Sequence, residues 1–185
     1  MKTYISIILT VFLLITLPIL TFTYSYTVVD SVQELNDVEV DEREELTRSV
    51  IDFLKFNEDL PDAFTTSMKN HFHDVRTIIL TGWIISLLSL ILLYNIDFDK
   101  REVYKKSTVT YGILILFIAF LAAFNFDLFF TYFHELLFPQ GNWQFPPNSL
   151  IIKLFPESFF ISATWICLGT STIATVLLYL TSRRS

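Results

Sequence analysis

The chain has 185 residues, 52% of them hydrophobic, and carries a formal net charge of −6. With a mean hydropathy of +0.51, this composition is too apolar for an ordinary soluble domain and indicates a small multi-pass membrane protein. Its acidic balance argues against a nucleic-acid partner, because proteins that neutralise phosphates need an excess of Lys and Arg.

Four long stretches of the chain contain almost no charged side chains. Each reaches the roughly 20 apolar residues that cross about 30 Å of hydrocarbon. The first stretch is too long for the apolar region of a signal peptide and has no Ala-x-Ala cleavage site after it, so we expect it to be retained. The sequence therefore predicts an all-α membrane protein with four transmembrane helices, at about residues 4–25, 77–96, 108–130 and 158–181.

Basic residues near the ends of these helices predict their orientation. Lys and Arg gather before the first helix, in the connecting segment 97–107 and after the fourth helix. By the positive-inside rule, these three regions face the cytoplasm. Both termini are then cytoplasmic, and the segments 26–76 and 131–157 form a small extracytoplasmic cap.

The first outer segment is strongly acidic, with 13 Asp or Glu against 5 Lys or Arg. Asp41 is typical of an N-cap, since an acid follows three residues later at Glu44, and apolar residues then recur at helical spacing. We therefore predict an amphipathic helix at about Glu42–Phe56, ended by the turn Asn57–Asp62. We expect its apolar stripe to pack on the bundle and its acidic face to meet water; a specific ligand role for the acidic face is the alternative.

Several kinds of chemistry have no support in the sequence. Cys167 is the only cysteine, and its place inside the fourth helix suits packing better than nucleophilic attack. No Ser or Cys lies in a nucleophile elbow, and 4 Gly are too few for a Gly-rich phosphate loop. Covalent catalysis, nucleotide chemistry and a bound cofactor are therefore not predicted.

The histidines and two aspartates fall at the outer ends of predicted helices. His71 and Asp74 lie just before the second helix, and Asp127 and His134 lie near the end of the third. Spacings of three and seven residues allow each pair to share a helix face. Histidine titrates near neutral pH and can both accept and release a proton; a solvated or capping role is the simpler alternative for each ring. An ionisable residue inside a span, as predicted for Asp127, is either functional or half of a structural pair.

Two groups of residues form motifs. The first is His71–Arg76. The second comprises Asn125-Phe126-Asp127, Phe133-His134, Phe138, Trp143, Leu150-Ile151 and the run Leu154–Phe160. Both groups resemble the motifs of a bacterial integral membrane family that includes the lipoprotein intramolecular transacylase, in which His71 matches the motif histidine and His73 the variable position. Members of the family tend to have an acid where this chain has Met68, and Asp where it has Asn125.

The resemblance implies a defined reaction at the outer surface of the bacterial cytoplasmic membrane. The substrate is the N-terminus of a diacylglyceryl-modified lipoprotein, whose sn-2 acyl chain moves to the α-amine of the lipid-bearing cysteine to give lyso-form lipoprotein. His71 and His134 divide the work of base and acid, in an order that the sequence leaves open. Because ester and amine belong to one molecule, orientation alone supplies roughly 7–11 kcal/mol of barrier lowering, so neither a covalent intermediate nor a cofactor is needed.

Four further residues are candidates for supporting roles. Asp74 and Asp127 could orient or polarise the histidines, and Arg76 or Trp143 could position the substrate or stabilise the tetrahedral oxyanion. The simpler roles are a snorkelling cation for Arg76 and an interfacial anchor for Trp143. Besides the lipoprotein substrate, the expected partner is membrane lipid; the sequence does not fix the oligomeric state, although a monomer is favoured.

Two other functions are compatible with the same residues. One is a zinc-dependent membrane hydrolase, because three His and a carboxylate suit zinc; its ligands would be His71, His73, His134 and Asp127. The other is a non-enzymatic sensor or accessory protein that binds a partner through the acidic outer segment. Histidine substitutions separate the three functions, because only the transacylase predicts an inactive, folded protein without loss of metal.

Overall fold

The computed structural model describes residues 1–23, 25–55 and 58–183. Within these ranges the regular structure is helical. The helices in chain order are α1 (Lys2–Thr23), α2 (Tyr26–Leu35), α3 (Arg43–Leu54), α4 (Thr66–Asn95), α5 (Lys100–Phe124), α6 (Phe126–Leu137), α7 (Leu150–Leu154) and α8 (Glu157–Ser182).

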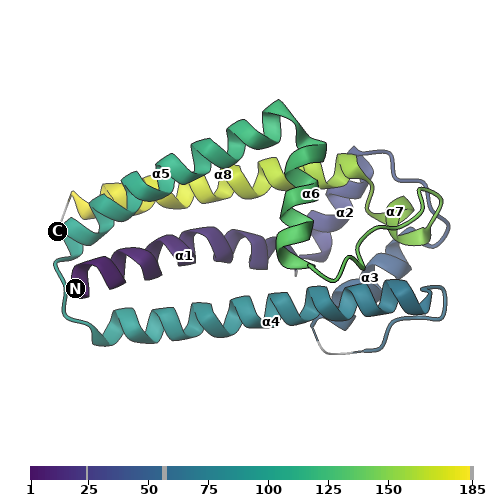
Figure 1. Ribbon diagram of the computed structural model, residues 1–185, viewed down its shortest axis with the longest axis horizontal. Coiled ribbons are helices and arrows are strands. Elements are labelled where there is room, and N and C mark those ends of the chain that lie inside the picture. Colours follow the sequence, from purple (N-terminus) through teal and green to yellow (C-terminus); the bar gives the residue numbers. More distant parts are fainter. Residues whose placement is uncertain (24, 56–57, 184–185) are drawn as a thin grey trace.

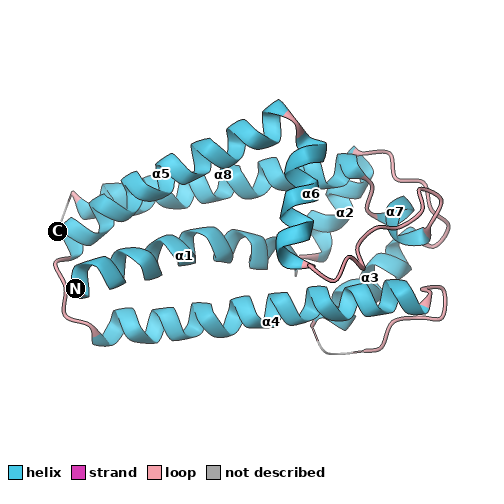
Figure 2. Ribbon diagram, viewed as in Figure 1, coloured by secondary structure: helices cyan, strands magenta, loops and turns pink. Residues whose placement is uncertain are grey.

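Four of the helices form an elongated bundle. α1, α4, α5 and α8 are each long and apolar enough to cross a membrane, which confirms the predicted fold class. α1 packs against the other three, and α5 packs along α8. The start of α1, the end of α8 and the α4–α5 connection lie at one end of the bundle, and the short helices lie at the other (Figure 1). Most loops also gather at that second end (Figure 2).

The third long helix differs from its predicted range. It begins at Lys100, where Asp99 accepts a hydrogen bond from the Glu102 backbone N–H at 3.0 Å, so much of the predicted loop 97–107 is helical. It ends at Phe124, and the prediction that it continues to residue 130 is wrong. Asn125 is extended, with φ −158°, and its side-chain oxygen accepts from the Leu128 N–H at 2.9 Å.

Asn125 therefore starts a new helix, because a side-chain oxygen at the N-cap satisfies a backbone donor that the helix itself cannot. The new helix, α6, turns across the end of the bundle (Figure 1). Asp127 lies in the first turn of α6. The prediction that it lies inside a transmembrane helix is therefore wrong. His134 lies in the last turn of the same helix.

The helix α4 is much longer than a membrane span requires. Its 30 residues extend about 45 Å, whereas about 20 residues suffice to cross the hydrocarbon. The uncharged run begins at Thr77, so we treat the residues from Thr77 onward as the membrane-spanning part. The first turns, Thr66–Arg76, project beyond it and carry His71 and Asp74 into the cap.

The predicted amphipathic helix exists, with different ends. α3 covers Arg43–Leu54, and Phe56 and Asn57 of the predicted helix and turn lie outside the described residues. The predicted Asp41 cap is wrong: Glu42 is the N-cap residue, in a left-handed conformation with φ 56° and without a side-chain cap bond. The apolar stripe packs as expected, in a core that contains Leu46, Val50, Phe53, Leu54, Leu60, Phe64, Met68, Phe72, Ile151 and Leu154.

A buried glutamine ties the two outer segments together. The Gln33 side chain of α2 is 0% exposed. Its amide nitrogen donates to the Leu154 carbonyl at 2.8 Å, and its amide oxygen accepts from the Thr47 hydroxyl at 2.9 Å. Because Gln33 and Thr47 belong to the first outer segment and Leu154 to the second, the two segments form one cap, as predicted.

Candidate active site

The structure brings His71 and His134 together, although they belong to different helices. Each is 8% exposed. The Phe138 ring contacts both, with centroid distances of 4.8 Å to His71 and 5.6 Å to His134. The nearby His134 also lowers the pKa of His71, because a positive charge on one ring disfavours a positive charge on the other. The predicted pair is therefore a single buried cluster at the junction of cap and bundle.

Aromatic rings enclose this pair. His134 lies 3.9 Å from the Phe130 ring and 4.9 Å from the Trp143 ring between centroids, and the Phe145 ring lies 5.6 Å from His71. We call these rings, together with Phe138 and Phe160, the aromatic cluster. Such apolar walls keep water away from the imidazoles and lower the local dielectric.

The backbone of α6 fixes the tautomer of His134. Its Nδ1 lies 2.9 Å from the carbonyl oxygen of Phe130. A carbonyl oxygen can only accept, so the neutral ring carries its proton on Nδ1 and its lone pair on Nε2. Burial lowers the pKa of His134, and the bond to Phe130 offsets part of this shift. His134 is therefore neutral at neutral pH, with Nε2 available as a base.

His71 lies on the projecting turns of α4, outside the membrane-spanning part. Burial, followed by the nearby His134, lowers the pKa of His71 to about 4, against opposing effects from Asn142 and Asp74. Its Nδ1 is buried and makes no hydrogen bond to any residue of the described ranges. His71 is thus also neutral at neutral pH, but its tautomer is not fixed as that of His134 is.

Asp74 contacts the loop that follows α6. One of its oxygens, Oδ2, accepts from the Gln140 side-chain amide at 2.9 Å and also from the Asn142 side-chain amide. Gly141 lies between the two amides with φ 76°, a left-handed conformation that glycine adopts without strain. Asp74 therefore ties the loop to α4 in front of His71. Sequence reasoning missed Gln140 and Asn142, because two amides in a Pro-containing loop carry no signal of a distant carboxylate.

Two of the predicted supporting residues do not join the histidine pair. The Arg76 guanidinium lies 4.0 Å from the Phe53 ring centroid and donates to the Phe53 carbonyl at 3.4 Å. Arg76 therefore faces α3. The Asp127 carboxyl interacts with that of Glu157, at the start of α8, two turns away from His134. Trp143, in contrast, packs directly on His134.

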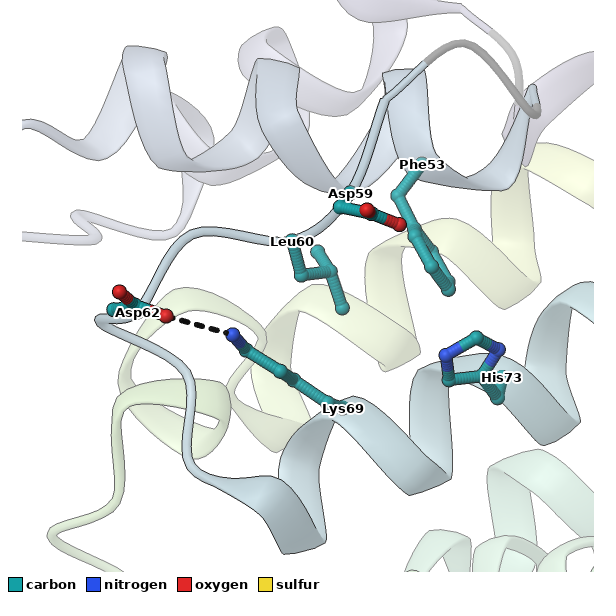
Figure 3. A pocket seen from close by; sticks show the side chains of 6 residues that line it. All are labelled: Phe53, Asp59, Leu60, Asp62, Lys69 and His73. Atoms are coloured by element: carbon teal, nitrogen blue, oxygen red, sulfur yellow. Dashed lines mark hydrogen bonds and ion pairs between the residues drawn. The ribbon is translucent and has the colours of Figure 1, made fainter.

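His73 occupies the face of α4 that Arg76 shares. Its Nδ1 is 3.3 Å from Arg76 Nη2, and its ring lies edge-on to Phe53. His73 also borders a cavity of about 310 Å³ that includes Lys69 and its ion pair with Asp62 at 3.2 Å (Figure 3). Neither His71 nor His134 lines this cavity.

The described part of the chain brings no group of three His, Cys, Asp or Glu side chains together as metal ligands. The set that the zinc-hydrolase alternative requires includes His73, which lies against Phe53, and Asp127, which lies against Glu157. The geometry of these donors is therefore not that of one metal centre.

Comparisons with known proteins agree with this architecture. The family model described as lipoprotein intramolecular transacylase Lit matches residues 1–160. The structure of the membrane-integral lipoprotein intramolecular transacylase Lit from Bacillus cereus has 25% sequence identity and a TM-score of 0.76, with 99% of this chain and 93% of that chain covered.

Two variants of the Bacillus cereus enzyme with one histidine replaced share this fold. The arginine variant has 22% identity and a TM-score of 0.76, over 99% of this chain and 89% of that one. The alanine variant has 24% identity and a TM-score of 0.69, over 99% and 91%. A search of curated proteins finds no match. The chain belongs to the lipoprotein intramolecular transacylase family and is a membrane-integral acyltransferase of lipoprotein processing.

Proposed function

We propose that the protein moves the sn-2 acyl chain of a diacylglyceryl-modified lipoprotein to the α-amine of that lipoprotein's own N-terminal cysteine. The product is lyso-form lipoprotein. The observation that carries this proposal is the pair of buried, neutral imidazoles around Phe138, His71 on α4 and His134 on α6. The family that matches the chain supports the reaction class.

Proton bookkeeping explains why two imidazoles are useful. The substrate nitrogen begins as an ammonium and ends as an amide, so it loses two protons: one passes to the glyceryl oxygen as the ester C–O bond breaks, and the other is released to water. We assign the proton that is released to water to His134, which takes it from the ammonium before the nitrogen attacks, because its Nε2 carries the lone pair. His71 then carries the remaining proton from the attacking nitrogen to the departing glyceryl oxygen.

The aromatic cluster suits an intramolecular reaction. Its walls exclude the water that would hydrolyse the ester and offer an apolar surface to the acyl chain. Holding the amine and the ester of one molecule against each other supplies roughly 7–11 kcal/mol of barrier lowering. An enzyme with these walls therefore needs little beyond two proton carriers.

The positive-inside rule supports an extracytoplasmic site. The basic residues of the chain's short flanks include Lys2, Lys105 and Lys106, and the helix ends that carry them lie at the end of the bundle away from the cap (Figure 1). We infer that this end and both termini face the cytoplasm. The histidine pair then lies at the outer surface of the bacterial cytoplasmic membrane, level with the lipid-bearing end of the substrate.

Expression in bacteria whose lipoproteins are diacylated with a free N-terminus tests the proposal. The N-terminal lipopeptide is fragmented in a mass spectrometer, because the reaction gives an isomer of unchanged mass. We expect fragments with one acyl chain on the cysteine nitrogen, and their loss in a normally expressed His134→Ala variant. Unchanged lipopeptides in the presence of abundant, membrane-inserted protein would overturn the proposal and favour an accessory role.

A further inference from the structure

One imidazole of the histidine pair has a buried nitrogen without a hydrogen bond among the described residues. The Nδ1 of His71 and the Oδ1 of Asn142 are both buried polar atoms without a hydrogen-bond partner in the described ranges. Such atoms are uncommon in folded proteins and require an explanation. The Asn142 side chain nevertheless lies close enough to the His71 imidazole to raise its pKa, so the two residues with unpaired buried atoms are neighbours.

Asp74 determines which end of the Asn142 amide faces His71. The carboxylate can only accept, and it accepts from the amide nitrogen of Asn142. The amide oxygen must therefore point away from Asp74. The Gln140 side-chain amide donates to the same carboxylate oxygen at 2.9 Å, so two amides of one loop hold the carboxylate.

His134 has a hydrogen bond at Nδ1 that His71 does not have. A carbonyl oxygen already holds the Nδ1 proton of His134, whereas Nδ1 of His71 has no such acceptor among the described residues. Hydrogen bonds at an active site are often long before substrate binds and shorten in the reacting complex. Closing the contact between His71 and Asn142 would give both imidazoles the same arrangement.

We infer that Asn142 is a positioning residue, whose Oδ1 accepts a hydrogen bond from His71 Nδ1 and so holds the lone pair of His71 on Nε2. This inference rests on the proposed transacylase function. Asp74 acts through Asn142: its charge polarises the amide and so stabilises the positive charge that develops when His71 carries a proton. The other titratable group near His71 is His134 on α6.

Kinetics of the purified full-length protein with a synthetic diacylglyceryl lipopeptide test the inference. Asn142→Ala should lower kcat by about 10- to 100-fold, by analogy with residues that orient metal-binding imidazoles, while KM changes little. Asn148→Ala is the matched control, since Asn148 lies exposed in the same loop; it should retain the wild-type kcat.

Exchanging the carboxylate of Asp74 and the amide of Asn142 distinguishes a positioning role from a role in folding alone. Asn142→Asp alone places two carboxylates side by side, and Asp74→Asn alone removes the charge, so each should lower kcat. The double variant D74N/N142D restores one amide and one carboxylate, and the carboxylate introduced at position 142 would still accept from His71. We expect the double variant to recover much of the lost kcat, a coupling that a double-mutant cycle measures.

Nitrogen-15 NMR of histidine-labelled protein gives a second readout. With a non-reactive lipopeptide analogue bound, the wild-type spectrum should show His71 protonated at Nδ1, and Asn142→Ala should show a mixture of tautomers. An active wild type together with a full-rate, single-tautomer Asn142→Ala would overturn the inference and leave the proposed function standing. A wild type that forms no N-acyl product would overturn both.

Discussion

In the cap, the buried core is mainly large and apolar, with Phe53, Phe64 and Leu154 at most 2% exposed, beside the hydrogen-bonded Gln33. In the bundle, several of the most deeply buried side chains are small and polar: Ser6, Ser86 and Ser107 are at most 1% exposed. Many large apolar residues of the bundle, such as Leu116 and Leu177, face outward. Water drives the cap to collapse around phenyl rings, whereas lipid gives the bundle no such drive, so small side chains let its helices approach.

The histidine pair lies where these two kinds of packing meet. His71 projects from a bundle helix into the cap, and His134 lies on α6, which crosses the end of the bundle. The meeting point offers apolar aromatic walls, and the proposed reaction places the ester and the amine of one substrate between them. The comparison can be tested by substitutions in each region.

The largest effect is expected in the cap core. Phe53→Ala should lower the free energy of unfolding by about 3–5 kcal/mol, because it removes a buried ring and leaves a cavity. Ser107→Ala in the bundle should change it by less than about 0.5 kcal/mol, since the Ser107 hydroxyl has no partner among the described residues. Thermal unfolding in detergent micelles measures both; equal losses would contradict the contrast between the regions.

The second largest effect on stability is expected at Gln33. Gln33→Ala leaves the Thr47 hydroxyl and the Leu154 carbonyl without their partner, and each buried polar group left unpaired costs about 1–3 kcal/mol. We expect lower cap stability and faster proteolysis of the loops, with the bundle intact. Limited proteolysis checks this, and a Gln33→Ala cap as resistant as the wild type would show that the bridge does not hold the two segments.

Asn125→Ala should have a smaller effect on stability, about 1 kcal/mol for a lost N-cap. Its functional effect should be larger, because Asn125 sets the direction in which α6 carries His134. Asn125→Asp, which can still cap the helix, is the matched control. Lipopeptide turnover and thermal unfolding should separate the two effects, and full turnover by Asn125→Ala would refute the role of this cap in placing His134.

The most gradual effect concerns pH. In the folded protein, the pKa of His71 is lowered to about 4 and the pKa of His134 is also lowered. As the pH falls, the unfolded chain therefore binds protons before the folded protein does. The contribution of both histidines to stability is complete above about pH 6.5 and decreases as the pH falls, and that of His71 is lost as the pH falls toward 4. The His71→Asn variant should lose less stability over this interval in thermal unfolding, and an unchanged pH dependence would count against a buried, neutral His71.

The sequence predicts the four long helices because a membrane span must satisfy its own backbone hydrogen bonds, which leaves a long uncharged run as a signal. It also predicts α3, whose apolar residues recur at helical spacing. It misses the turn at Asn125, since one asparagine in an apolar run is a weak signal until its side chain is seen to cap Leu128. That turn also explains why the expected place of Asp127 inside a span was wrong.

The candidate site could likewise be predicted only in part. The pairing of His71 with His134 follows from motifs that the chain shares with its family, and the structure brings the two together. The partners of Asp74 could not be predicted, because Gln140 and Asn142 are distant in sequence and meet Asp74 only after α6 turns back. Arg76 packs on Phe53, and its expected role toward the substrate stays a prediction.

Turnover of a synthetic diacylglyceryl lipopeptide by three single-histidine variants tests the central claim most directly. His71→Ala and His134→Ala should each lower kcat by about 10²- to 10⁴-fold, the contribution of a positioned acid or base. His73→Ala should stay close to wild type, because His73 lies apart from the aromatic cluster, against Phe53. An active His71→Ala or His134→Ala variant, or a loss confined to His73→Ala, would contradict the account.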